Sequence, residues 1–390
     1  MLQFVMEISA DKIKVLALLQ QWFIEKKQPF ITLGGYAGTG KTTLLALFRK
    51  ELFQKFPKLH VAFCSYTGKA ARVLEEKLKI AGSIYPKDFT GTIHSLIYSP
   101  IVNKNEEIIG WELKPKISYD LIIIDEGSMV DETIWHDLLG YKIPIIAAGD
   151  HGQLPPINGK FNLLQKPQQI LATIHRQMAE NPIIQVSILA RESGTIPIKK
   201  FGNHVEKFPL HDNESQEILN DLLETVDSET LVLCGYNKTR IRLNQHIRAL
   251  HGIESPTPIS GDKVICLRNN HEKGIYNGMI GIITSIEASD EAWYYAEIAL
   301  DGLAKPFKGL IFQAQFNSPT PINFTGNRRQ TIKGDLFDFG YALTVHKAQG
   351  SEAKRVILIE EKFSQMTPEL WKRWLYTAVT RASEELYILG

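Results

Sequence analysis

The segment between Pro29 and Leu52 constrains the fold of this chain more than any other. An apolar run, FITLG, leads into the glycine-rich stretch GYAGTGKT, and an apolar-faced helical pattern follows. In such a loop the glycines let backbone N–H groups wrap a phosphate chain, the lysine balances the charge and the threonine hydroxyl reaches a magnesium ion. Its position between a predicted strand and a predicted helix favours this interpretation over an incidental glycine turn. The residues predicted to bind the nucleotide here are Gly35, Gly38, Thr39, Gly40, Lys41, Thr42 and Thr43.

Strand-like and helical patterns alternate around this loop. An opening helix is predicted over residues 8–26, with Ser9 or Asp11 as its cap. Further apolar, β-like runs lie at residues 60–66, 120–128 and 144–150. This alternation predicts an α/β fold in which helices cover both faces of a parallel sheet.

The pattern changes twice along the rest of the chain. Short runs on either side of the polar tract NKNEE predict a hairpin within residues 97–118. A buried strand followed by a helix over residues 229–252 begins a second α/β domain. Residues 261–334 contain glycines and short β-like runs, which predict a small β-barrel inserted into that domain.

Composition limits the class of protein. A length of 390 residues with 44% hydrophobic residues predicts two to three folded units. Cys64, Cys234 and Cys266 each stand alone, which indicates buried thiols in a reducing cytoplasm rather than disulfides or a zinc site. No apolar stretch approaches the roughly 18 residues of a spanning helix, and the segment MLQFVMEISADKIK lacks the basic-then-apolar order of a signal peptide, so we expect a cytoplasmic protein without a membrane partner. The net charge of +1 means that any nucleic-acid surface must be local.

Two further strand ends carry polar side chains suited to phosphate chemistry. The run LIIIDE ends in Asp125 and Glu126, which are predicted to hold magnesium and to activate the attacking water, respectively. Gln153 follows another apolar strand and is predicted to orient water or sense a γ-phosphate. Arg176 and Arg381 are candidate arginine fingers, which stabilise charge on the transferred phosphoryl group. Together these residue types indicate nucleotide hydrolysis.

Seven or eight such segments, in this order, resemble the motifs of superfamily 1 helicases of the RecD-like and Dda-like 5′-to-3′ group. The segments are GGYAGTGKTT, SYTGKAARVL, GTIHSL, IIIDEGSMVD, AAGDHGQLPP, TIHRQ, YALTVHKAQGSE and WLYTAVTRA. The resemblance spans nearly the whole chain. It implies ATP and Mg²⁺ as cofactors, with Lys41, Glu126, Gln153, Arg176 and Arg381 as catalytic residues, Thr42 and Asp125 at the metal, and Glu352 at the ribose. The positions that contact the nucleic acid would be Thr67, Lys69, Thr92, His94, Thr344, His346 and Lys347.

The resemblance also implies a domain plan. Two RecA-like P-loop NTPase domains lie in tandem, the first over residues 1–96 and 119–177 and the second over residues 178–260 and 335–390. Residues 97–118 resemble the strand-separating pin, and residues 261–334 resemble an inserted SH3-like barrel. Two positions depart from the family pattern: Lys12 stands where a glutamine that reads adenine is expected, and Tyr66 where a proline is common.

The implied function is an ATP-driven motor that moves 5′ to 3′ on single-stranded DNA and separates duplex strands. The implied partners are single strands and duplex junctions, with replication or repair proteins as further candidates, for a monomer in a bacterial or phage-infected cell. Three alternatives stay open at this point: a nucleotide-dependent switch, a translocase that displaces proteins without unwinding, and a motor on RNA, since phosphate contacts do not report the 2′-hydroxyl.

Overall fold

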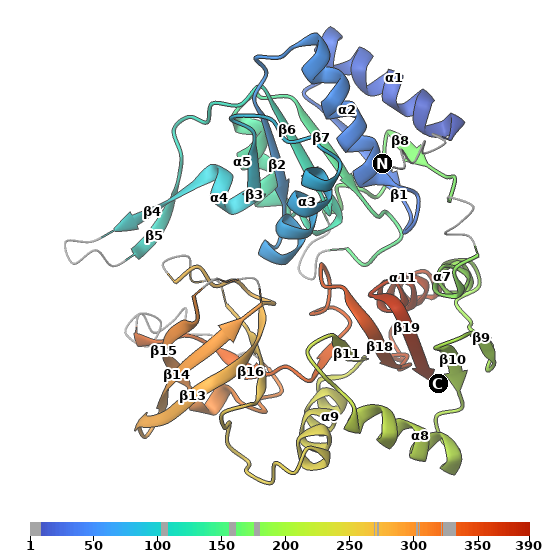
Figure 1. The fold of residues 1–390 in the computed structure, drawn as a ribbon, viewed down its shortest axis with the longest axis vertical. Coiled ribbons are helices and arrows are strands. Elements are labelled where there is room, and N and C mark those ends of the chain that lie inside the picture. Colours follow the sequence, from blue (N-terminus) through green and yellow to red (C-terminus); the bar gives the residue numbers. More distant parts are fainter. Residues whose placement is uncertain are drawn as a thin grey trace. The chain divides into compact units, whose positions relative to one another are not determined.

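The computed structural model describes two compact units. They are Met1–Ile184 and Gln185–Gly390, so the division falls within helix α7 (Pro182–Glu192) rather than at residue 177. The described residues are 9–102, 108–155, 161–174, 180–268, 270, 273–301, 303, 305–320, 322 and 333–390. Figure 1 shows the elements of both units. No helix among these residues combines the length and apolarity needed to cross a membrane.

The first unit is built on a parallel six-stranded sheet in the order β3-β2-β6-β7-β1-β8 (Figure 1). Its strands are β1 (Phe30–Gly35), β2 (Val61–Ser65), β3 (Phe89–Thr92), β6 (Leu121–Asp125), β7 (Ile145–Gly149) and β8 (Gln169–Leu171). Its helices are α1 (Ala10–Glu25), α2 (Lys41–Lys55), α3 (Gly68–Ile80), α4 (Ile93–Ile97) and α5 (Glu132–Gly140), with a 3₁₀ turn, η1, at Gly127–Met129. The α/β prediction is confirmed for this unit.

Strand alternation explains the two cores of this sheet. Val61 and Phe63 of β2 pack with α1, α2 and α3 on one face, whereas Ala62 and Cys64 pack with α4 and α5 on the other. Neighbouring side chains in a strand point to opposite faces, so an all-apolar strand serves both helical layers. The parallel strands all end at one edge, which brings the segments after β1, β2, β6 and β7 together.

The segment predicted as a hairpin forms a separate two-stranded antiparallel sheet, β4 (Tyr98–Val102) and β5 (Ile108–Leu113). Its tip, residues 103–107, lies outside the described residues. The base is anchored to α5: Tyr98 bonds Asp137, and the Tyr141 hydroxyl lies 2.6 Å from the Lys114 carbonyl oxygen. The pair of strands is therefore tied to the first unit at its base.

The second unit contains a six-stranded sheet in the order β17-β11-β18-β19-β10-β9, in which only β9 is antiparallel to its neighbour. The strands are β9 (Lys200–Gly202), β10 (Val205–Phe208), β11 (Thr230–Cys234), β17 (Ala342–Thr344), β18 (Ala353–Ile359) and β19 (Ala382–Leu389). Helices α8 (Asn213–Glu224) and α9 (Asn237–Leu250) pack on one face in a common apolar core, and α11 (Pro368–Val379) contacts β18 and β19. A second α/β unit is confirmed.

A five-stranded antiparallel sheet is inserted between α9 and β17, in the order β15-β14-β13-β12-β16. Its strands are β12 (Lys263–Cys266), β13 (Ile280–Asp290), β14 (Trp293–Leu300), β15 (Phe307–Phe312) and β16 (Phe337–Phe339); a 3₁₀ turn, η2 (Gln313–Gln315), follows β15. The predicted boundary at residue 334 is early, because β16 belongs to this sheet. Strand alternation sends Phe337 into the core of the inserted sheet and Phe339 into the core of the α/β sheet.

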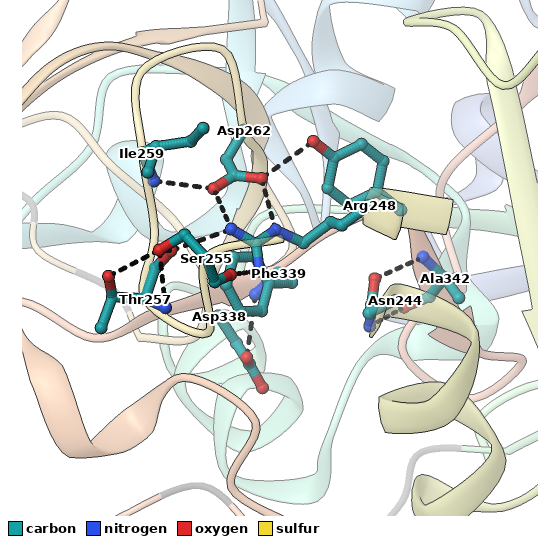
Figure 2. Close-up of polar contacts among 10 residues, drawn as sticks. Asn244, Arg248, Ser255, Thr257, Ile259, Asp262, Asp338, Phe339 and Ala342 are labelled. Atoms are coloured by element: carbon teal, nitrogen blue, oxygen red, sulfur yellow. Dashed lines mark hydrogen bonds and ion pairs between the residues drawn. The ribbon is translucent and has the colours of Figure 1, made fainter. Parts of the chain in front are cut away.

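Polar side chains connect α9 to the root of the inserted sheet (Figure 2). The Arg248 guanidinium donates to both carboxylate oxygens of Asp262, at 2.8 and 3.0 Å, and to the Ser255 and Thr257 carbonyls. Tyr341 donates its hydroxyl proton to the same carboxylate. The charges of this buried pair are satisfied by a full set of partners, which is the condition for a buried ion pair to be tolerated.

The cysteine prediction is confirmed in part. All three cysteines are buried and unbridged. Burial raises the pKa of each thiol, for Cys266 to about 12, so these groups stay protonated at neutral pH. Such thiols behave as small apolar side chains of the core.

Candidate nucleotide and nucleic-acid sites

The glycine-rich loop between β1 and α2 has the geometry of a phosphate cradle. Gly38 and Gly40 have φ values of 78° and 79°, a left-handed conformation that side chains rarely adopt. The Thr39 hydroxyl donates to the Tyr36 carbonyl at 2.8 Å, so this buried side chain braces the loop from within. Gly40 is the N-cap of α2, a 15-residue helix whose N-terminal dipole favours an anion.

The lysine and threonine of the loop meet the end of β6. The Lys41 ammonium donates to the carbonyls of Gly35 and Tyr36, at 2.7 and 3.2 Å, which holds it over the loop. The Thr42 hydroxyl donates to the Asp125 carboxylate at 3.0 Å. Thr43 lies beside them in the first turn of α2. Residues far apart in the sequence are thus brought together as the loop pattern predicts.

Glu126 stands immediately after this aspartate with a positive φ of 56°. A non-glycine residue in this conformation is uncommon and is found disproportionately at functional sites. Its amide N–H donates to Asp125 Oδ1 at 3.0 Å, which fixes the turn between the two acidic residues. Because of this backbone conformation, the Glu126 side chain leaves the chain in a different direction from the one it would take if β6 continued.

The segment after β7 contributes the remaining polar group of this edge. Gln153 and Asp150 are both buried, and the backbone N–H of Gln153 donates to the backbone carbonyl of Asp150 at 3.3 Å. The imidazole of His151 lies 4.4 Å from the ring of Tyr36, centroid to centroid. The segments after β1 and β7 are therefore in contact at the predicted nucleotide site.

The second unit contains Arg381 and Glu352, which immediately precede β19 and β18, respectively. The Arg381 guanidinium is buried and donates to the carbonyls of Thr377 and Ser351, each at 3.0 Å. Glu352 directly follows Ser351 in the chain and is exposed. Arg176 lies outside the described residues.

The four predicted nucleic-acid positions in the first unit begin helices or lie in them. Thr67 and Thr92 are N-caps of α3 and α4, where their hydroxyls accept from the amides of Ala70 and Ser95. Burial lowers the pKa of His94, and nearby Asp131 only partly opposes this, so the ring is neutral at pH 7. The side chain of Lys69 lies outside the described part of the structure.

The matching positions in the second unit follow β17. Thr344 ends the strand, and its carbonyl accepts from the amides of Lys347 and Ala348 in a tight turn. Burial lowers the pKa of His346. Burial, and then the charge of Arg240, lowers the pKa of Lys347 to about 8, with Asp338 opposing.

Comparisons with known proteins agree with this arrangement. The family model described as "AAA domain" matches residues 18–205, and the model described as "UvrD-like helicase C-terminal domain" matches residues 339–389. The ATP-dependent RecD2 DNA helicase of Deinococcus radiodurans is 29% identical over 383 residues, which cover 92% of this chain and 47% of that protein. The ATP-dependent DNA helicase Pif1 of Campylobacter jejuni is 24% identical over 90% of this chain and 86% of that protein. The chain is therefore similar to RecD-like and Pif1-like helicases of superfamily 1 over most of its length.

Solved structures of Pif1 helicases share the fold of this chain. The structure of Bacteroides Pif1 in complex with ADP-AlF3 and single-stranded DNA has a TM-score of 0.52 and 20% identity over 98% of this chain and 92% of that one. A structure of Pif1 helicases at forked double-stranded DNA gives the same TM-score over 99% of this chain. This likeness supports the assignment of two RecA-like units. The chain spans about half the length of the RecD2 helicase.

Sequence patterns did not reveal the charged neighbours of Lys347. Arg240 of α9 donates to Asp338 at 2.8 Å in a nearly buried ion pair, and also to the Ser318 carbonyl. Burial raises the pKa of Asp338 although Arg240 opposes this. The three charges come from α9, β16 and the turn after β17, and no local spacing links them.

The lowered pKa of Lys347 predicts a pH-dependent affinity for nucleic acid. The free protein loses this charge as the pH rises through about 8, and a phosphate contact requires the charged form. We expect affinity for an oligothymidylate to fall up to about tenfold between pH 7 and pH 9, because the charged fraction of the lysine falls by that order. Fluorescence anisotropy at fixed salt measures this.

The matched variant is Lys347→Arg, whose guanidinium stays charged throughout this range. It should bind with an affinity that is flat between pH 7 and pH 9. An equally steep decline in this variant would assign the pH dependence to another group.

Proposed function

We propose that this chain is an ATP-dependent motor that moves along single-stranded DNA, 5′ to 3′, and separates duplex strands. The observation that carries the proposal is the meeting of Lys41, Thr42 and Asp125 at one sheet edge, with the Thr42 hydroxyl 3.0 Å from the carboxylate. A loop that wraps phosphates and a strand-end carboxylate at this distance form the minimal apparatus of a P-loop nucleotidase. The relatives named above are ATP-dependent DNA helicases.

ATP would be held by the loop residues Gly35, Gly38, Thr39, Gly40, Lys41, Thr42 and Thr43, with Glu352 at the ribose. The Thr42 hydroxyl and the Asp125 carboxylate are hard oxygen donors, which fits magnesium. Within the described residues no cluster of three or more His, Cys, Asp or Glu side chains is available to hold a metal alone, so the phosphates would complete its coordination. Bound Mg²⁺ would neutralise charge on the phosphates.

In the chemical step, Glu126 would accept the proton of the attacking water and Gln153 would orient that water. Arg176 and Arg381 would stabilise the negative charge of the transferred phosphoryl group. The Arg381 guanidinium donates to the Thr377 and Ser351 carbonyls, and a shift of this side chain towards the nucleotide would weaken its bond to Ser351 and move the neighbouring segment. Hydrolysis would thereby be coupled to movement of the second unit.

The single strand would be held by Thr67, Lys69, Thr92, His94, Thr344, His346 and Lys347. Hydroxyls and ammonium groups of this set bind phosphates without reading sequence, and neutral imidazoles can meet bases. We assign the two RecA-like domains to residues 1–96 with 119–177 and 178–260 with 335–390. Residues 97–118 would act as the strand-separating pin, and the inserted antiparallel sheet as an SH3-like barrel.

Nucleotide preference is the part of the proposal where this chain departs from its family. Lys12, at the expected adenine-reading position, is only 1% exposed, and burial lowers its pKa with Asp11 opposing. The buried lysine replaces the paired donor and acceptor of a glutamine amide, which match the adenine edge. We therefore expect relaxed discrimination between ATP and GTP, measured as the ratio of their kcat/KM values.

The test is ATP hydrolysis with and without single-stranded DNA, together with unwinding of duplexes that carry a 5′ or a 3′ tail. We expect hydrolysis that DNA stimulates, and unwinding of the 5′-tailed duplex only. Glu126→Gln keeps the shape of the side chain but removes the base, so it should lower kcat by about 10²- to 10⁴-fold while ATP binding persists. The same assays with RNA strands in place of DNA test whether the motor moves on RNA.

Each contrary outcome points to a different function. A rate of ATP hydrolysis that does not change when nucleic acid is added would indicate a nucleotide-dependent switch. Stimulated hydrolysis without unwinding of either tail would indicate a translocase that displaces bound proteins. Unwinding from the 3′ tail alone would reverse the proposed polarity.

A further inference from the structure

We infer that Tyr236, braced by Phe363, stacks on a base of the single strand in the second unit. None of the motif positions above includes either residue. The inference rests on the proposed function, since it extends the strand-binding surface beyond Thr344 and His346. The group that Tyr236 would contact is the π-face of a nucleotide base.

The sheet order places Tyr236 next to the proposed strand-binding turn. Strands β17 and β11 are parallel neighbours, and Thr344 pairs with Cys234 in their register. The Val345 amide donates to the Cys234 carbonyl at 3.1 Å, which continues this pairing past the strand end. Tyr236 lies two residues after Cys234, and His346 lies two residues after its register partner Thr344. Both side chains therefore belong to the same edge of the sheet.

Phe363 comes from the third strand of the same edge. It follows β18, the other neighbour of β11, and its ring meets that of Tyr236 edge to face, with centroids 4.3 Å apart. The Tyr236 hydroxyl donates to the Lys362 carbonyl at 3.4 Å. The ring is therefore held from the side by a second aromatic ring and at its tip by a hydrogen bond.

A carboxylate fixes the backbone beneath the ring. Glu361 accepts from the amides of Gly235 and Tyr236, at 2.8 and 3.1 Å, and from the Thr239 hydroxyl at 2.6 Å. A Cβ at Gly235 would lie only 2.9 Å from the Glu361 Cβ, so a glycine is needed for this close approach. The position of the tyrosine is thus built in before any strand binds.

Tyr236 nevertheless remains 43% exposed, among the larger values for apolar or aromatic side chains described here. A rigid, exposed ring at the edge that carries strand-binding residues is what a stacking platform requires, because every base presents a π-face. Stacking is favourable by a factor of about 5 to 150 in affinity per base. The ring loses little conformational freedom on binding because it is already held.

The contact should be with a base rather than a phosphate. The N-terminus of α9 begins at Asn237, and Glu361 already occupies the amides that a phosphate would use. Its negative charge also repels a phosphate at this point. The tyrosine contact should therefore release no counterion and leave the salt dependence of binding unchanged.

The test compares binding of a fluorescent oligothymidylate by wild type and by Tyr236→Ala, without nucleotide, over a series of salt concentrations. We expect a loss of about 5- to 150-fold in affinity with an unchanged slope against log salt. Tyr236→Phe and Tyr236→Trp keep a ring and should bind within about twofold of wild type. With an abasic oligonucleotide of equal length, Tyr236→Ala and wild type should bind alike, since no base is present to stack.

The matched control is Tyr295→Ala, which removes a ring of similar exposure, 41%, from the inserted sheet and should leave affinity unchanged. If wild type binds no single strand, the proposed function itself fails. If wild type binds and Tyr236→Ala binds equally, only this inference is wrong. A loss in Tyr236→Phe as large as in Tyr236→Ala, or a defect that persists on the abasic strand, would show a structural role and would overturn it too.

Discussion

Replacing Lys41 by methionine is expected to lower kcat for ATP hydrolysis by about 10²- to 10³-fold. The ammonium group is held over the phosphate loop by the Gly35 and Tyr36 carbonyls, at 2.7 and 3.2 Å. Methionine keeps the length of the side chain but removes the charge that would stabilise the transferred phosphoryl group. Steady-state phosphate release at saturating single-stranded DNA measures the effect.

The control for this variant is Lys50→Met, on the same helix about 13 Å further along its axis. It removes one lysine from α2 away from the loop, so hydrolysis should stay within about twofold of wild type. The two variants should also unfold at similar temperatures. Hydrolysis by Lys41→Met at the wild-type rate would refute the assignment of this loop as the catalytic nucleotide site.

Replacing Arg49 by methionine is expected to reduce the free energy of unfolding of the first unit by about 3–5 kcal/mol. Arg49 donates to both oxygens of Asp88 at 2.9 Å, and both side chains are 0% exposed. Its guanidinium also lies 4.6 Å from the centre of the Tyr85 ring. Removing the arginine leaves a buried carboxylate whose charge is no longer balanced.

Chemical denaturation followed by circular dichroism measures this change. The comparison is Lys354→Met, which breaks the ion pair of Lys354 with Glu229, at 2.7 Å but with both side chains 53% exposed. Solvent screens such a surface pair, so this variant should unfold at the wild-type denaturant concentration. Equal stability of Arg49→Met and wild type would mean that the buried pair contributes nothing net to the fold.

The amino-acid sequence was sufficient where the chemistry depends on local spacing. The strand, glycine loop and helix around Lys41 are encoded in one continuous stretch, because glycine conformations and apolar periodicity act over a few residues. The α/β alternation, the paired strands at residues 97–118 and most of the inserted antiparallel sheet followed from the same kind of signal. The roles of the motif residues, by contrast, were inferred from family resemblance and not from local spacing alone.

The sequence was insufficient where one strand contributes to two cores. Residues 337–339 were predicted to return to the α/β domain, yet Phe337 packs in the inserted sheet and Phe339 in the α/β core. Both residues are apolar, so hydrophobicity alone does not say which core receives which ring. The strand pairing of β16 decides it.

What the sequence by itself determined is the set of local elements and the phosphate loop, since these depend on near neighbours. Only the tertiary structure decided which distant groups meet. Arg49 finds Asp88, Arg240 finds Asp338 near Lys347, and Tyr236 meets Phe363 at the edge that carries Thr344. These pairs form because the order of strands in a sheet differs from their order in the chain, and that order is fixed by packing of the whole core.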